Sequence, residues 1–173
     1  MNIWIPPQAA PGDASVEFPF TGLPPGVEAA ALRILPVTIQ KVAPGLFSAN
    51  GSGQGVAAAT AVRVIANLQG PVQVFSCDAA ATCVATPIDL GLDTPVYLSL
   101  NGTGIRRASR LSNVVVTIGT VKIEPTYADL QPQIPGLDQV NVPLPLTLRG
   151  SGLVNVTVTV DGVKSNAVQI DIL

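Results

Sequence analysis

The chain has 173 residues, of which 47% are apolar and 12% are charged, about half the charged share of an ordinary soluble domain. Its 9 basic and 11 acidic residues leave no positive excess to neutralise phosphates, so the composition predicts no nucleic-acid binding. No stretch approaches the roughly 20 apolar residues of a membrane-spanning helix. We therefore expect a chain that does not span a membrane and whose low charge favours association with other proteins.

Residues 1–42 predict three strands. Alternating runs around Val16 and Leu32 mark two of them, and Ile3, Trp4 and Ile5 mark the third. Three strands are too few to shield both faces of a sheet, so we expect a partial immunoglobulin-like unit. Packing in a core is our first interpretation of Trp4. An exposed contact stays open, which makes Ile3, Trp4 and Ile5 a candidate interaction surface.

Residues 43–95 are rich in glycine and proline and predict a β segment with a disulfide hairpin. Cys77 and Cys83 flank a five-residue tip at which their side chains come within bonding reach. A metal site would need two further ligands, and the chain has no histidine. The Gly-rich run at residues 50–55 lacks the following Lys-Ser/Thr of a phosphate loop, so we expect a turn-rich loop.

A disulfide indicates an oxidising compartment, so we expect an extracellular or cell-surface protein. The first residues, with Pro6 and Pro7 close to the start, lack the basic and apolar regions of a signal peptide. If exported, the sequence is then expected to be a fragment or a mature form.

Residues 96–173 predict a compact immunoglobulin-like β-sandwich. Valines alternate with polar residues from Val154 to Val160, the period expected of a strand with one buried face. Asp161-Gly162 follows as a two-residue hairpin signal, and a second alternating run surrounds Ile170. Strand signals dominate the chain as a whole, so the predicted fold class is all-β.

The two ends of the chain repeat one pattern. Residues 1–6 (Met-Asn-Ile-Trp-Ile-Pro) are echoed by residues 140–145 (Val-Asn-Val-Pro-Leu-Pro). In each copy a glycine and two alternating runs follow. The repeat indicates two copies of one β unit, the first lacking its beginning.

Catalytic and cofactor-binding patterns are weak. Without histidine there is no Ser-His or Cys-His pair and no imidazole base. The pair Asp129 and Asp138 is expected on solvated loops. Arg106, with its neighbours Arg107 and Arg110, is expected at a solvated loop tip, an anion contact being the alternative. We predict no enzyme activity, no cofactor and no metal site.

Several strings together resemble a known family, the uncharacterised C-terminal domain family of Solibacter-type acidobacterial secreted proteins. They are VAPGLFSANGSGQG at residues 42–55, YLSLNGTGI at 97–105, PGLDQVNVPLP at 135–145 and SNAV at 165–168. The resemblance implies immunoglobulin- or TIG-like modules on secreted or surface proteins, with no assigned catalytic activity.

We expect a structural or adhesive module that binds protein, either by self-association or through the other domains of its parent protein. One alternative is a filament subunit that assembles by β-strand complementation through residues 1–42. A second is a carbohydrate-binding module, although one Trp and two Tyr supply few stacking surfaces for a glycan.

Overall fold

The computed structural model describes residues 5–6, 8–18, 33–66 and 68–173, and in these residues the prediction of an all-β fold is confirmed. Apart from two short 3-10 turns, η1 (Leu111–Asn113) and η2 (Leu146–Leu148), the regular structure is antiparallel strand. The chain divides into two compact units, residues 1–41 and 42–173.

The described residues of the first unit, 5–6, 8–18 and 33–41, form one hairpin. Strand β1 (Gly12–Phe18) pairs antiparallel with β2 (Arg33–Ile39), with Gly12 opposite Ile39 and Val16 opposite Leu35. The third strand predicted here falls on residues 3–5, of which Ile3 and Trp4 lie outside the described residues.

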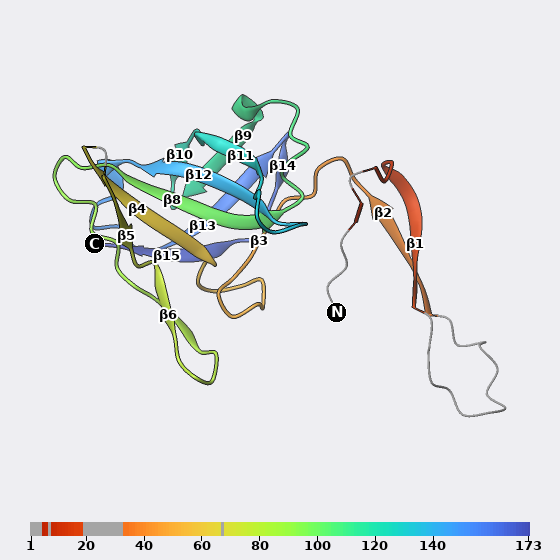
Figure 1. Ribbon diagram of the computed structural model, residues 1–173, viewed down its shortest axis with the longest axis horizontal. Helices are drawn as coiled ribbons and strands as arrows, with labels where there is room; N and C mark the ends of the chain where they lie inside the picture. Colours follow the sequence, from red (N-terminus) through yellow and green to blue (C-terminus); the bar gives the residue numbers. More distant parts are fainter. Residues whose placement is uncertain (1–4, 7, 19–32, 67) are drawn as a thin grey trace. The chain divides into compact units, whose positions relative to one another are not determined.

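The second unit contains two larger sheets that face each other and a separate two-stranded sheet, β6 (Phe75–Cys77) with β7 (Cys83–Ala85) (Figure 1). One sheet is built on β13 (Gly152–Val160), which pairs with β9 (Val114–Ile118) along one edge. Along its other edge β13 pairs with β15 (Val168–Ile172) and with β14 (Val163–Lys164). Strand β10 (Val121–Ile123) extends this sheet beyond β9.

The other sheet has the order β11-β12-β8-β4-β5. Its strands are β11 (Tyr127–Leu130), β12 (Asp138–Leu144), β8 (Val96–Thr103), β4 (Ala59–Ile65) and β5 (Leu68–Val72). The short β3 (Gly45–Leu46) pairs with the end of β8 beyond β4. Here Gly104 approaches the chain closely: a Cβ on it would lie 2.1 Å from the carbonyl oxygen of Ala43.

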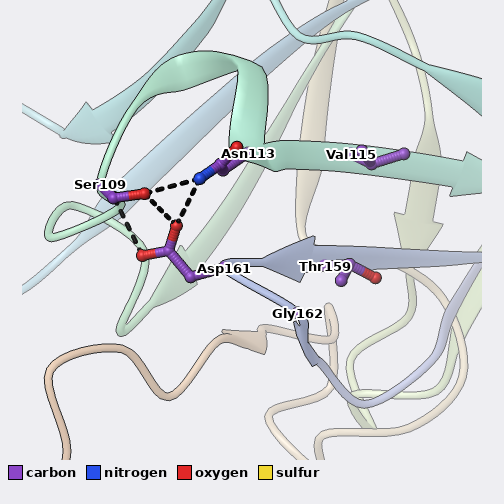
Figure 2. Close-up of a pocket in the computed structure, with 6 residues that line it drawn as sticks. All are labelled: Ser109, Asn113, Val115, Thr159, Asp161 and Gly162. Carbon is purple, nitrogen blue, oxygen red and sulfur yellow. Dashed lines mark hydrogen bonds between the residues drawn. The ribbon is translucent and has the colours of Figure 1, made fainter.

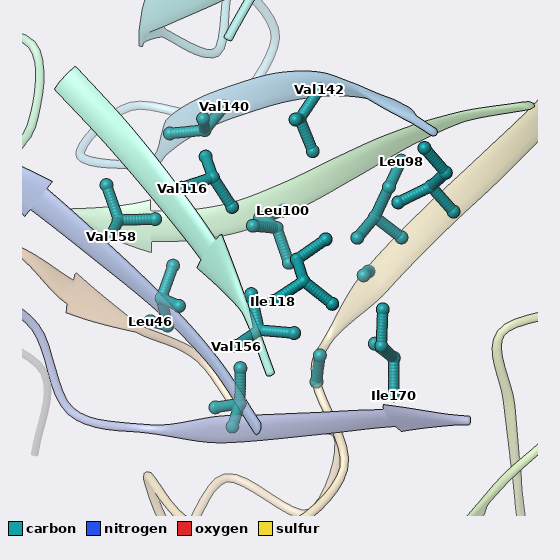
Figure 3. Close-up of a cluster of buried hydrophobic side chains, with 14 of the residues drawn as sticks. Leu46, Leu98, Leu100, Val116, Ile118, Val140, Val142, Val156, Val158 and Ile170 are labelled. Atoms are coloured by element: carbon teal, nitrogen blue, oxygen red, sulfur yellow. The ribbon is translucent and has the colours of Figure 1, made fainter. Parts of the chain in front are cut away.

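The core lies between the two sheets and follows the alternation read from the sequence. Val156, Val158 and Val160 of β13 are fully buried, as are Val168 and Ile170 of β15. They face Leu98 and Leu100 of β8 and Val140 and Val142 of β12 (Figure 3). Period-two alternation therefore puts alternate residues of the central strands of both sheets, such as β8, β9, β12 and β15, into one shared core.

The outer edge of β15 is covered by two segments from elsewhere in the chain. Gln169 donates its N–H to Gly55 O (2.8 Å) and accepts at its carbonyl from Ala57 N (2.9 Å). Ile88 N donates to Asp171 O (2.9 Å), and Leu173 N donates to Ile88 O (3.0 Å). Residues 43–95, expected to be a separate segment, thus supply strands β3, β4 and β5 to the sheet of β8 and β12 and isolated bridges to β15, and their apolar residues share that core.

Candidate interaction surfaces

A disulfide-closed hairpin projects from the sandwich (Figure 1). Strands β6 (Phe75–Cys77) and β7 (Cys83–Ala85) pair antiparallel, and Cys77 and Cys83 are bonded, as the sequence predicts. Asp78 orders the tip, because its Oδ1 accepts from Ala80 N (2.9 Å) and Thr82 N (2.8 Å). Val84 stays 57% exposed on this hairpin. The result is a rigid, exposed and nearly uncharged tip.

Asp138 is buried and forms an ion pair with the partly exposed Arg106, which corrects the expectation that Asp138 lies on a solvated loop. Asp138 is fully buried, and its Oδ2 accepts from Ile105 N (2.7 Å) and Arg106 N (3.2 Å). The Arg106 side chain bonds the other carboxylate oxygen and Leu137 O, the latter at 2.9 Å. Burial without these partners would be costly, so the pair holds the loop after β8 onto the start of β12.

An open depression lies beside the β13–β14 turn, lined by Ser109, Asn113, Val115, Thr159, Asp161 and Gly162 (Figure 2). Asp161 and Gly162 both have positive φ, 48° and 86°, as the predicted two-residue turn requires. The Asp161 carboxylate accepts from Ser109 N (2.9 Å), from Ser109 Oγ, and from Asn113 Nδ2 (3.2 Å). These bonds fasten the turn to the loop that contains η1.

The depression offers little to a substrate. The Ser109 hydroxyl already donates to a carboxylate that also bonds two other groups, and the chain has no histidine to act as base. None of its six lining residues is aromatic, so it has no platform on which a sugar ring stacks. Its hydrogen bonds serve the fold.

The Gly-rich loop is a turn structure, as predicted. Asn50 Oδ1 accepts from Ser48 Oγ and Ser52 Oγ, both at 2.8 Å, so the loop closes on itself. Asn166 then clamps it to the sandwich: its Oδ1 accepts from Leu46 N (2.7 Å), and its Nδ2 donates to Leu46 O (2.9 Å) and Gly53 O (2.7 Å). One side-chain amide thus continues the pairing of β3.

Over the residues whose side chains are described, 12–17 and 35–39, one face of the β1–β2 hairpin is apolar. Paired residues share a face, so Ala14, Val16, Leu35, Val37 and Ile39 lie together. Leu35 is 49% exposed and Val37 is 37% exposed. On the opposite face Thr38 Oγ1 donates to Asp13 Oδ1 (3.3 Å). Among the described residues neither strand pairs with a third, so both outer edges are open.

The three residues of the predicted interaction surface are placed only in part. Ile5 is 53% exposed, while Ile3 and Trp4 lie outside the described residues. In the described part of the chain, no cluster of three metal-ligating side chains occurs. The same residues include no helix with the length and apolarity needed to cross a bilayer.

No protein-family model matches the chain, and no curated protein or solved structure matches it. The resemblance drawn from the sequence strings therefore stays a prediction.

Sequence reasoning missed two polar side chains that bond segments far away in the chain, Asp138 and Asn166. Asp138 lies 32 residues from Arg106, and nothing local to either residue marks the pair. One signal was present for Asp138, because it is the first residue of β12 and alternates in step with Val140 and Val142, which point inward. A charged residue on a buried face predicts a partner.

Proposed function

We propose that this chain is a non-enzymatic structural or adhesive β-sandwich module that acts outside the cell and binds protein. The observation that carries the proposal is the projecting hairpin β6–β7, closed by the Cys77–Cys83 disulfide. A disulfide persists in oxidising environments, which supports an extracellular or surface location.

The hairpin has the properties of a presented contact surface. Its tip is held by the disulfide and by Asp78, so little conformational entropy is lost when a partner binds. Its exposed side chains are small or apolar, including Ala79, Ala80 and Val84. Such a surface suits an apolar patch on another protein or on another domain of the parent protein.

The remaining polar groups support a structural role. In the described ranges no buried side-chain nitrogen or oxygen lacks a hydrogen-bond partner. Catalytic sites commonly hold strained or unsatisfied polar groups, whereas here the carboxylates of Asp138 and Asp161 bond backbone and side-chain donors. The resemblance to modules of secreted acidobacterial proteins agrees with this proposal.

The test is binding of the labelled full chain to envelopes of the source cells. Val84→Asp is expected to weaken binding at least about tenfold, since a charge would replace an apolar contact. The matched control is Leu92→Asp, which changes a leucine that is 82% exposed on another loop. If both variants and the wild type bind equally, the β6–β7 hairpin is not the contact surface. Substrate turnover by the purified chain would overturn the proposal of a non-enzymatic module.

A second candidate function is self-assembly by strand complementation through the first unit. At seven residues each, β1 and β2 are the longest edge strands in the described part of the chain. The two hairpins have the same register, so Pro36 of β2 takes the position that Gln169 has in β15. The N–H of Gln169 points to the outer edge of β15. Pro36 has no N–H, so the outer edge of β2 lacks a hydrogen-bond donor at this position. Of the two outer edges, the one without a proline is therefore that of β1.

Charge determines how β1 would pair. Two copies of β1 aligned antiparallel about Ser15 would place Asp13 opposite Glu17, and like charges in direct opposition are unfavourable. That register of a symmetric β1–β1 pair is therefore disfavoured. We infer heterologous pairing with a different edge of the second copy, and heterologous contacts that do not close give filaments.

Light scattering of the full chain tests this candidate. Ser15→Pro removes the N–H at the centre of the open edge and is expected to abolish any assembly, whereas Ser15→Ala keeps that N–H and the assembly. A wild-type chain that stays monomeric at all concentrations would remove the candidate.

For the carbohydrate-binding alternative, no contact in the described residues favours a glycan. A glycan array on the wild-type chain tests it directly.

A further inference from the structure

The Gly-rich loop at residues 50–55 contains a reactive pair of residues. Asn50-Gly51 is one of two Asn-Gly pairs in the chain, the other being Asn101-Gly102. In such a pair the backbone nitrogen of glycine can attack the side-chain amide of asparagine, because glycine has no Cβ to obstruct the approach. The two pairs have the same covalent chemistry, so their surroundings in the fold determine whether each one reacts.

The surroundings of Asn50-Gly51 favour this attack. Both residues are exposed, and a Cβ on Gly51 would meet nothing within 4 Å beyond its chain neighbours. Asn50 Oδ1 accepts from the buried Ser48 Oγ (2.8 Å) and from Ser52 N (3.1 Å). Attack on Cγ moves negative charge onto Oδ1, so donors that already point at this oxygen stabilise the transition state. In return Gly51 N gives up its hydrogen bond to Ser48 O (3.0 Å).

The surroundings of Asn101-Gly102 oppose it. Gly102 is buried in β8 between β3 and β12, where it pairs with Leu46 on one side and with Asp138 on the other. A Cβ on Gly102 would lie 2.5 Å from Gly45 O, so the backbone here has little room to move toward the side-chain amide. The second pair is therefore an internal control for the first.

We propose that Asn50-Gly51 is a site of self-modification, at which Asn50 is converted to aspartate and isoaspartate. The Gly51 nitrogen bonds to Asn50 Cγ, and Nδ2 leaves as ammonia together with the proton that the Gly51 nitrogen loses. Water then opens the cyclic imide. Opening at Cγ gives aspartate, whereas opening at the main-chain carbonyl gives isoaspartate, in which the chain runs through Cγ and gains one carbon.

The modification affects a sheet edge, because the loop covers the outer edge of β15. Gly53 O accepts from Asn166 Nδ2 (2.7 Å), and Gly55 O accepts from Gln169 N (2.8 Å). Isoaspartate at residue 50 lengthens the loop, so these bonds weaken and the edge at Gln169 opens. An open edge can pair with a strand of another molecule. Loss of ammonia makes the step one-way, so association increases as the protein ages.

This inference is independent of the proposed function, because it concerns neither the β6–β7 surface nor the edge of β1. Incubation of the full chain in mildly alkaline buffer tests it, with peptide mass mapping and enzymatic methylation of isoaspartate as readouts. The chain unfolded in urea gives the intrinsic rate of each pair. In the folded chain, Asn50 is expected to react at least as fast as in the unfolded chain, and Asn101 at least about tenfold more slowly.

Hydrogen exchange at the Gln169 amide tests the effect on β15. Exchange is expected to become about tenfold faster after incubation of the wild type, because the acceptor Gly55 O moves away. Asn50→Gln is the matched control. It keeps a side-chain amide but places it one carbon too far for the five-membered ring, so its exchange is expected to stay as it was before incubation.

Two results would overturn the proposal. If Asn50 reacts as slowly as Asn101 in the folded chain, the loop holds its side chain away from attack. If exchange at Gln169 does not change, or rises equally in the wild type and in Asn50→Gln, the modification does not open the edge of β15.

Discussion

The hairpins β1–β2 and β13–β15 share a register and an alternating pattern, yet only the second has a buried face. Val168 and Ile170 are fully buried, whereas Leu35, the counterpart of Val168, is 49% exposed. Strand β13 pairs with β9, and the outer edge of β15 is covered, whereas in the described residues β1 and β2 pair only with each other. Alternation therefore specifies which face of a hairpin is apolar, and the facing sheet determines whether that face is buried.

The largest expected effect contrasts Ile170→Ala with Val37→Ala at the equivalent position. Ile170→Ala leaves a cavity in a packed core and is expected to lower the free energy of unfolding of the sandwich by about 2–5 kcal/mol. Val37→Ala, in the other unit, is expected to change it by less than about 0.5 kcal/mol. Urea unfolding followed by tyrosine fluorescence measures this, since Tyr97 and Tyr127 both lie in the second unit. A similar loss from both variants would mean that the two hairpins are equally buried.

The next effect concerns the loop after β8, which Asp138 holds to the start of β12. Asp138→Ala leaves the N–H groups of Ile105 and Arg106 without their acceptor, and we expect a loss of about 2–3 kcal/mol. Arg106→Gln is the milder variant, because the Arg106 side chain is 26% exposed and Asp138 keeps its two backbone donors. Urea midpoints rank the two, and a larger loss for Arg106→Gln would contradict the assigned role of the backbone donors.

Replacing both cysteines tests how far the disulfide distinguishes the exposed hairpin β6–β7 from the exposed hairpin β1–β2, which has no covalent closure among its described residues. The double variant Cys77→Ser with Cys83→Ser is expected to lose at most about 2 kcal/mol, because the loop it opens is short. The effect should be confined to β6–β7 and appear as faster proteolysis within residues 78–82. Unfolding of the whole sandwich at a much lower urea concentration would show that the disulfide supports the core.

The smallest effect tests the β13–β14 turn. Asp161→Ala removes the acceptor for Ser109 and Asn113 and places alanine at a positive φ, so we expect a loss of about 1–2 kcal/mol. Asp161→Asn tolerates that φ and keeps one acceptor oxygen, so it is expected to lose less. Thermal unfolding of the two variants separates the contribution of the carboxylate from that of the backbone.

The elements with local signals were predictable. The valines of β13, the Asp161-Gly162 turn and the Cys77–Cys83 pair each carry their information within a few residues. Contacts between distant segments were not, because a strand's partner leaves no local mark. Thus the sequence did not predict that residues 55–57 and Ile88 cover the edge of β15. Nor did it predict the hydrogen bonds between Asn166 and Leu46. The candidate surface at Ile3, Trp4 and Ile5 stays a prediction.

The close approach of Gly104 to Ala43 has a mechanical consequence. Ala43 N donates to Gly104 O (3.0 Å), and β3 follows at once, paired to the end of β8. Only Gln40 and Lys41 separate the end of β2 from the buried Val42. Tension transmitted along the chain from the first unit would therefore load the Ala43–Gly104 bond and the β3–β8 pair before it reached the core strands. If the module bears force, the Ala43–Gly104 hydrogen bond and the β3–β8 pair are the first contacts to break.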